Sequence, residues 1–120
     1  MRNRERGLAD YRGRKILLVF FSLECEHSRA LAPELGLLPK GAPQLVVLSR
    51  GDPAEHRKLA RENEWTADVL LEEGLEISVR YQSIGTPGAY VIAEDGRIAS
   101  VLALGGEAVL GIALEATPAA

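Results

Sequence analysis

Two uninterrupted apolar runs constrain the fold of this chain more than any other feature of the sequence. They span 15–21, with the letters KILLVFF, and 44–49, with the letters QLVVLS. Runs without polar alternation are typical of central strands that are buried on both faces. Between them the apolar spacing changes to i, i+4, i+7 at Leu31, Leu35 and Leu38, which indicates a helix. This strand–helix–strand unit predicts a parallel pair of strands with a right-handed crossover.

The rest of the chain continues the alternation of strands and helices. A helix is expected to begin at Asp52, whose side chain can cap it, and to end near Glu64. Pro53 suits the first turn of this helix, and Glu55 can close a capping box. We expect a short strand at 69–71 and a short helix at 75–81. Two strands follow at 89–93 and 97–103, joined by the hairpin turn 94–97, and a last helix is expected at 105–116.

This order predicts an α/β fold with a central mixed β-sheet flanked by helices on both faces. The 120 residues suit one domain, which we place at 15–116 behind a polar arm at 1–14. Basic residues concentrate in and beside the arm, which we interpret as solvated rather than as a site for phosphates or anionic lipid. Aromatic residues make up only 5% of the chain, too few for a nucleic-acid stacking platform, and no apolar run reaches membrane-spanning length.

Cys25 is the one cysteine of the chain, so an intrachain disulfide is impossible. A metal site is not expected from one cysteine and two well-separated histidines, and no cofactor is expected. Cys25 follows the strand at 15–21 and begins a helix, whose positive end favours a thiolate. His27 can add positive charge, whereas Glu24 and Glu26 oppose a second anion. The alternative is a small buried structural cysteine.

A resemblance to a known family favours the redox interpretation. The segment 20–35, FFSLECEHSRALAPEL, resembles the active-site strand, loop and helix of the thioredoxin superfamily, where a C-x-x-C motif is followed by a proline eight residues after the first cysteine. Here Cys25 and Pro33 have that spacing. Thr86-Pro87 is similar to the superfamily's cis-proline loop. The segments 8–15 and 95–97 look most like TlpA-type and methylamine-utilisation (MauD) thiol:disulfide reductases.

Three positions depart from the family pattern. Ser28 stands where the second, resolving cysteine is found, Val19 replaces a buried acid of the central strand, and Glu24 replaces an aromatic residue. The resemblance therefore implies a one-cysteine, C-x-x-S version of the site. In it Cys25 forms a mixed disulfide that an external thiol must release.

The resemblance also implies the roles of the neighbouring residues. His27 occupies the position at which DsbA-type disulfide oxidases stabilise the thiolate, and Ser28 is placed to donate a hydrogen bond to it. Catalytic roles therefore fall to Cys25, His27 and Ser28, and substrate contacts to Glu26 and to a cis Thr86-Pro87 pair. The partners implied are protein disulfides or low-molecular-weight thiols, with an extracytoplasmic or membrane-tethered location.

Two other functions remain open. The first is a non-catalytic module that binds an extended peptide along the Pro87 loop. The second is a thiol peroxidase, because Ser22 precedes Cys25 by three residues as a threonine does in peroxiredoxins, but the proline expected nearby is absent. Among other candidates, His56 is expected on the exposed face of a charged helix, and Trp65 is expected to serve packing rather than binding.

Overall fold

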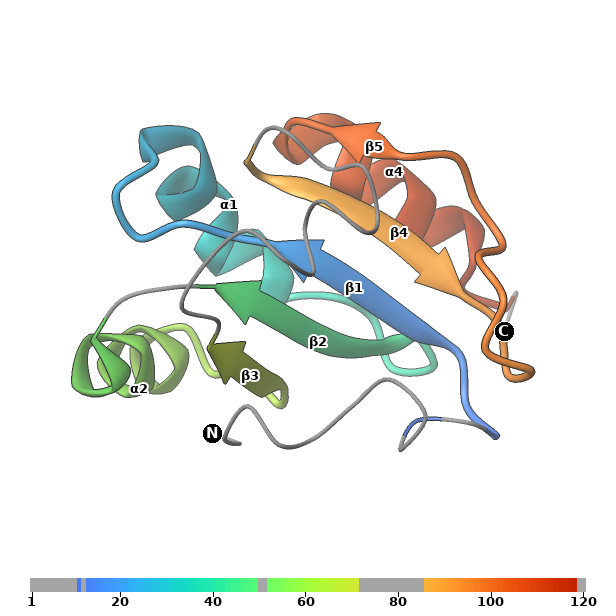
Figure 1. Ribbon diagram of the computed structural model, residues 1–120, viewed down its shortest axis with the longest axis horizontal. Coiled ribbons are helices and arrows are strands. Elements are labelled where there is room, and N and C mark those ends of the chain that lie inside the picture. The colour runs from blue at the N-terminus through green and yellow to red at the C-terminus, as the bar shows by residue number, and fades with distance from the viewer. Residues whose placement is uncertain (1–10, 12, 50–51, 72–85, 119–120) are drawn as a thin grey trace.

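A mixed β-sheet forms the centre of the molecule (Figure 1). The computed structural model describes residues 11, 13–49, 52–71 and 86–118. In this part of the chain the sheet has five strands in the order β3-β2-β1-β4-β5. β1 pairs in parallel with β2 and antiparallel with β4. The strands are β1 (Ile16–Phe20), β2 (Gln44–Ser49), β3 (Asp68–Leu71), β4 (Gly88–Ile92) and β5 (Ala103–Leu104).

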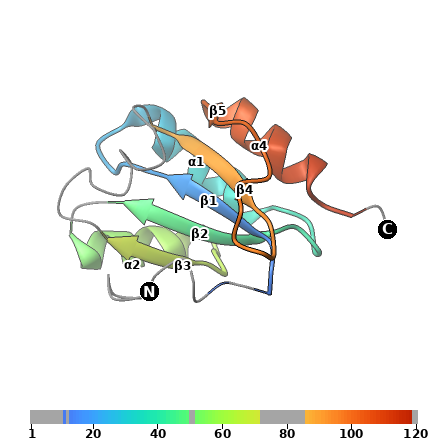
Figure 2. The same ribbon diagram turned by 45° about the vertical axis from the view of Figure 1, so that its right-hand side comes forward.

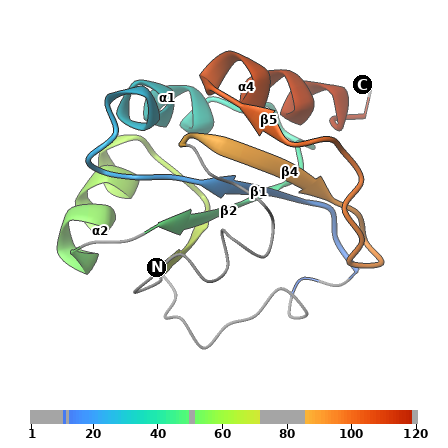
Figure 3. The ribbon, with the colours of Figure 1, turned by 45° about the horizontal axis from the view of Figure 1, so that its top comes forward.

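The described helices pack against one face of this sheet. They are α1 (Glu26–Gly36), α2 (Pro53–Glu62) and α4 (Gly106–Glu115). Figures 2 and 3 show α1 and α4 together above the same face, and the two helices are in contact. α2 joins the same apolar cluster through Leu59 and Ala60. α1 and α2 lie on the same side of the sheet because both follow right-handed crossovers in the same direction, from β1 to β2 and from β2 to β3.

Strand residues alternate strictly between the two faces. Leu17 and Val19 of β1 belong to the cluster beneath the helices, whereas Ile16, Leu18 and Phe20 belong to a second cluster on the opposite face. All five β1 residues are buried, as the uninterrupted apolar run predicts. The helix expected at 75–81 lies outside the described residues.

The strand expected at 97–103 is much shorter in the structure. The tight turn at 94–97 forms, with a hydrogen bond from the Ala93 N–H to the Arg97 carbonyl oxygen at 2.8 Å. Beyond it an isolated bridge joins Ile92 to Ile98, and regular pairing resumes only at β5. The physical reason lies at Ser100, whose Oγ accepts the Val91 N–H at 2.9 Å and so takes the place of a backbone partner.

The beginning of α2 agrees with the sequence, but its end does not. The Asp52 side chain accepts a hydrogen bond from the Ala54 N–H at 3.0 Å, and Pro53 occupies the first turn. The helix ends at Glu62, two residues earlier than expected. Glu64 adopts a left-handed conformation with φ 56°, and the Trp65 N–H donates to the Ala60 carbonyl oxygen at 2.9 Å, which terminates the helix.

Trp65 serves packing, as expected from the sequence. Its indole N–H donates to the Ala32 carbonyl oxygen at 2.8 Å, and its ring meets Phe21 edge-to-face with centroids 5.6 Å apart. The end of α1 approaches this region so closely that a Cβ atom at Gly36 would collide with the Asn63 carbonyl oxygen. The Trp65 loop therefore holds α1 against the segment that follows α2.

The sequence prediction for His56 is wrong. Instead of lying on the exposed face of α2, His56 is fully buried. Its Nδ1 is 2.9 Å from the Asp52 carbonyl oxygen, and its Nε2 is 2.8 Å from Ser49 Oγ. A carbonyl only accepts, so Nδ1 carries the proton and Nε2 accepts from the Ser49 hydroxyl. The imidazole thus ties the first turn of α2 to the end of β2, and these two hydrogen bonds compensate for its burial.

We predict that His56→Ala destabilises the fold. The substitution removes a buried side chain and deprives the Ser49 hydroxyl of its imidazole partner, at a cost of about 2–4 kcal/mol in the free energy of unfolding. Urea unfolding followed by circular dichroism measures the difference. Arg57→Ala, at an exposed position of the same helix, is the matched control and should change stability by less than about 0.5 kcal/mol. Equal stability of the two variants would contradict a structural role for His56.

Candidate active site

Cys25 lies at the end of the central strand and begins α1. It is the N-cap residue, with extended backbone angles of φ −91° and ψ 118°. Its carbonyl oxygen accepts the Arg29 N–H at 3.0 Å, and its own N–H donates to the Ser22 carbonyl oxygen at 3.1 Å. The thiol is free and partly exposed. A thiol in this position lies beside the unpaired N–H groups of the first helical turn.

The loop before β4 forms the opposite side of the site. The Thr86–Pro87 peptide bond is cis, in agreement with the expectation from the sequence. The Cys25 thiol donates to the Thr86 carbonyl oxygen at 3.2 Å, although 61 residues separate the two. The antiparallel pairing of β1 with β4 sets Phe20 opposite Gly88 and so brings the two loops together.

Hydrogen bonds to sulfur favour the thiolate of Cys25. A hydrogen bond with the Thr86 side chain contributes most to lowering the pKa of the thiol from its ordinary value of 9.0. Partial burial opposes this effect. The backbone N–H and hydroxyl of Ser28 and the backbone N–H of His27 lower the pKa further. The cause is that donors around the sulfur stabilise its charged form more than desolvation destabilises it.

Ser28 lies beneath the thiol in the first turn of α1. It is completely buried, and its Oγ accepts the Ser22 N–H at 3.3 Å. A hydroxyl has one donor and two acceptor positions, so Ser28 can accept from Ser22 and still donate toward sulfur. Its position connects the loop before Cys25 to the helix after it.

The remaining residues expected at the site are distributed around its rim. Glu24, Glu26 and His27 are all exposed, and only the backbone N–H of His27 contributes to the lowered pKa of Cys25. A thiolate-stabilising role for the His27 imidazole therefore stays a prediction. Val19, at the family's buried acid position, is fully buried within the apolar cluster beneath the helices.

Two supporting contacts were not expected from the sequence. The Ser22 N–H is the partner of Ser28, and the Gly105 N–H donates to the Pro87 carbonyl oxygen at 2.9 Å. Gly105 has a φ of 90°, which glycine adopts without strain, and it anchors the cis-proline loop to the start of α4. The two adjacent glycines at 105–106 indicate an unusual backbone conformation, but the contact of Gly105 with Pro87 depends on the pairing of β4 with β5.

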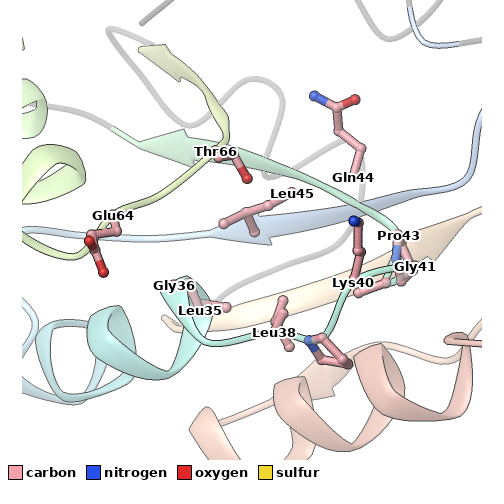
Figure 4. A pocket seen from close by; sticks show the side chains of 12 residues that line it. Leu35, Gly36, Leu38, Lys40, Gly41, Pro43, Gln44, Leu45, Glu64 and Thr66 are labelled. Atoms are coloured by element: carbon pink, nitrogen blue, oxygen red, sulfur yellow. The ribbon is translucent and has the colours of Figure 1, made fainter.

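A pocket of about 450 Å³ lies away from Cys25 (Figure 4). It lies at the C-terminal end of α1 and the start of β2, whereas Cys25 lies at the N-terminal end of that helix. Leucine side chains from α1 and β2 and the loop at 39–43 line it, and Cys25 does not. The candidate site at Cys25 is therefore separate from this pocket.

Within the described part of the chain, no three His, Cys, Asp or Glu side chains form a group that could hold a metal ion. None of the described helices is long and apolar enough to cross a membrane.

Comparison with solved structures identifies the fold. A DsbE thiol:disulfide interchange protein of Chlorobium tepidum aligns with a TM-score of 0.73 and 19% identity, over 91% of this chain and 84% of its own. The thioredoxin domain of a thiol-disulfide oxidoreductase from Bacteroides vulgatus aligns with a TM-score of 0.69 and 17% identity, over 92% of this chain and 84% of its own. A secreted Mycobacterium tuberculosis disulfide oxidoreductase homologous to E. coli DsbE aligns with a TM-score of 0.66 and 18% identity, over 86% of this chain and 85% of its own.

These likenesses show that the fold is thioredoxin-like, with the mixed sheet and helices expected from the sequence. A search of curated proteins by sequence found no match. A family model, however, matches residues 2–101, which include the whole of α1 with Cys25 and the Thr86–Pro87 loop. That match extends over most of the sequence, and on this basis the chain belongs to the AhpC/TSA family.

Proposed function

We propose that this protein is a thiol:disulfide redox protein that acts through a single nucleophile, Cys25. The observation that carries the proposal is the contact between the Cys25 thiol and Thr86 at the cis-proline loop, at 3.2 Å. A partly exposed thiol with a lowered pKa is the state in which a cysteine attacks disulfides. Membership of the AhpC/TSA family supports the same chemistry.

The reaction consists of one exchange of sulfur partners. The Cys25 thiolate attacks one sulfur of a substrate disulfide, the substrate S–S bond breaks, and a new bond joins Cys25 Sγ to that sulfur. The second substrate sulfur leaves with the electron pair and takes a proton from water. No electrons are gained or lost overall, because one disulfide replaces another.

Ser28 sets the outcome of this reaction. Cys25 is the sole cysteine of the chain, so no second thiol can attack the mixed disulfide from within the protein. An external thiol must attack the adduct, and the fate of the substrate depends on which sulfur it reaches. The Ser28 hydroxyl contributes a hydrogen bond to the Cys25 thiolate instead of a second nucleophile.

The substrate class follows from the partial exposure of the free Cys25 thiol. Protein disulfides and mixed disulfides of small thiols can both reach Cys25, with Thr86 and Pro87 as the surface against which a substrate chain lies. The Mycobacterium tuberculosis protein with this fold is described as secreted. We propose an extracytoplasmic location for this chain as well, where disulfides are common.

The substitution Ser28→Cys should convert a protein that accumulates mixed disulfides into one that turns over. With Ser28, we expect covalent adducts to accumulate and insulin reduction by dithiothreitol to proceed close to the uncatalysed rate. Ser28→Cys supplies a preoriented thiol, and turnover should rise at least about tenfold, since positioned groups have high effective concentrations. Intact mass spectrometry measures the adduct and turbidity measures the turnover.

Ser28→Ala is the matched control, because it removes the hydroxyl without adding a thiol. It should form adducts but not turn over. If neither the unchanged protein nor Ser28→Cys forms an adduct, Cys25 is not a nucleophile, and the alternative of a peptide-binding module is favoured. Equal turnover of the unchanged protein and Ser28→Cys would show that an external thiol resolves the adduct efficiently.

The pH dependence of alkylation tests the activation of Cys25. Because the pKa of the thiol is lowered from 9.0, the thiolate fraction at neutral pH exceeds that of an ordinary cysteine. The rate of iodoacetamide alkylation should therefore rise to its plateau at a lower pH than for a model peptide. Thr86→Val removes the hydroxyl at nearly constant volume and should move this midpoint to higher pH.

His27→Ala separates the two contributions that His27 can make. The substitution keeps the backbone N–H, so an unchanged midpoint assigns the effect to the helix backbone. A midpoint at higher pH assigns it to the imidazole. An alkylation profile identical to that of the model peptide in the unchanged protein would contradict the activation of Cys25.

A further inference from the structure

A backbone hydrogen bond joins the Thr86–Pro87 loop to the start of α4. The Gly105 N–H donates to the Pro87 carbonyl oxygen at 2.9 Å. Gly105 is also the N-cap residue of α4, and its carbonyl oxygen accepts the Val109 N–H at 3.0 Å. Figure 1 shows the end of β5 and the start of α4 beside the beginning of β4, in agreement with the pairing of these two strands. One residue therefore connects the loop to the helix through its two backbone groups.

The backbone conformation of Gly105 is one that only glycine adopts readily. Its φ of 90° and ψ of 154° lie in a region that is essentially restricted to glycine. A Cβ atom at this position would meet no heavy atom within 4 Å apart from its chain neighbours, so the requirement for glycine comes from the backbone and not from lack of space. A residue with a side chain favours negative φ. Because β5 and α4 are held by their own packing, the peptide group that carries the Gly105 N–H would have to turn away from Pro87.

The loop that Gly105 holds is the loop that contacts the thiol. The Thr86 carbonyl oxygen accepts the Cys25 thiol at 3.2 Å. The Thr86 side chain contributes most to lowering the pKa of Cys25. Thr86 and Pro87 are adjacent, so a displacement of the Pro87 carbonyl group reaches the contact with Cys25 with little chain to absorb it. The conformation of Gly105 is thus connected to the sulfur by two successive hydrogen-bonded contacts.

We propose that Gly105 is a positioning residue for the reaction of Cys25: through Pro87 it holds Thr86 against the sulfur, and so it determines how readily the thiol reacts. The proposal rests on the proposed function of Cys25. Gly105 acts through the loop and takes no part in the bonds that change.

Two other glycines provide controls. Gly13 precedes β1, at the opposite end of the strand from Cys25, and has a φ of 94°, open space around a Cβ atom and an N–H that donates to the Glu94 carbonyl oxygen at 2.9 Å. Gly13→Ala therefore introduces the same kind of backbone strain at a hydrogen bond of the same length, away from the site. Gly106→Ala adds a Cβ atom at the first position of α4, 3.6 Å from Leu31 Cδ1, which is an ordinary contact.

The test measures the rate of Cys25 alkylation by iodoacetamide as a function of pH, together with urea unfolding. In Gly105→Ala the midpoint of the alkylation profile should move to higher pH, and the rate at neutral pH should fall about fivefold, the effect of about one net hydrogen bond. Gly13→Ala should lose similar resistance to urea but keep the midpoint, and Gly106→Ala should keep both. An unchanged midpoint in Gly105→Ala, or an equal shift in Gly13→Ala, would overturn the proposal.

The charged groups around Cys25 do not differ between these proteins. Glu24, Glu26 and His27 are exposed beside Cys25 in the sequence, and Glu107 is exposed in the first turn of α4. None of them is substituted in the test, and each substitution exchanges one uncharged residue for another. A change in the alkylation midpoint therefore reports on the hydrogen bonds at the sulfur and not on an altered charge.

A double-substitution cycle tests whether Gly105 acts through Thr86. When Thr86→Val is already present, Gly105→Ala should move the midpoint much less than it does in the unchanged protein, because the two residues share one contact. Equal shifts in both backgrounds would contradict an action through Thr86. Gly105→Asn is a second variant, since asparagine adopts positive φ more readily than alanine, and its midpoint should lie between those of glycine and alanine.

Hydrogen exchange tests the same contact in the unchanged protein and does not depend on the folding of any variant. The Gly105 amide is hydrogen-bonded to Pro87, so it should exchange with deuterium much more slowly than an amide of an unstructured peptide. Nuclear magnetic resonance measures this rate. Exchange as fast as in the peptide would overturn the proposal.

Formation of a mixed disulfide with oxidised glutathione, measured by intact mass spectrometry, separates the failure of this inference from the failure of the proposed function. If the unchanged protein forms the adduct but Gly105→Ala keeps the alkylation midpoint, the inference is overturned while the redox function stands. If none of the proteins forms an adduct, the redox function is overturned, and the alkylation profiles still decide whether Gly105 positions the thiol.

Discussion

The burial of β1 is the constraint on which the rest of this structure depends. The strand has a neighbour on each edge and apolar side chains on each face, so its backbone and side chains are all removed from water. Parallel pairing with β2 requires a crossover helix, and that helix is α1. Cys25 therefore lies between the fully buried strand β1 and the N-terminus of α1, of which it is the N-cap residue.

Antiparallel pairing with β4 completes the site from the other side. It aligns the end of β1 with the beginning of β4, and Thr86 consequently lies against the thiol. The loop is anchored by the hydrogen bond from Gly105 to Pro87, at the start of α4. Two segments that are distant in sequence, at Cys25 and at Thr86, thus converge on one sulfur atom, and Gly105 of a third segment holds the Thr86–Pro87 loop. The donors they present shift the balance toward the thiolate without a buried charge partner.

The local chemistry of the site combines activation with restraint. Ser28 and Thr86 lower the pKa of Cys25 and so favour its thiolate. In the proposed reaction, the single cysteine of the chain leaves no second thiol for intramolecular release of a bound substrate. Under the proposed function, the activation of Cys25 and the release of a bound substrate therefore depend on different groups.

Local patterns in the sequence determined most of the elements and the position of the candidate nucleophile, Cys25. The apolar runs at 15–21 and 44–49 predicted β1 and β2, Asp52 and Pro53 predicted the start of α2, and the motif around Cys25 predicted the site. These features depend on periodicity and capping within a few residues. Only the tertiary structure decided the burial of His56, the replacement of a strand partner by Ser100, and the contribution of the Thr86 side chain to the lowered pKa of Cys25. Each of these features depends on a partner residue that strand pairing or helix packing brings close. The spacing of neighbouring residues in the sequence does not specify such partners.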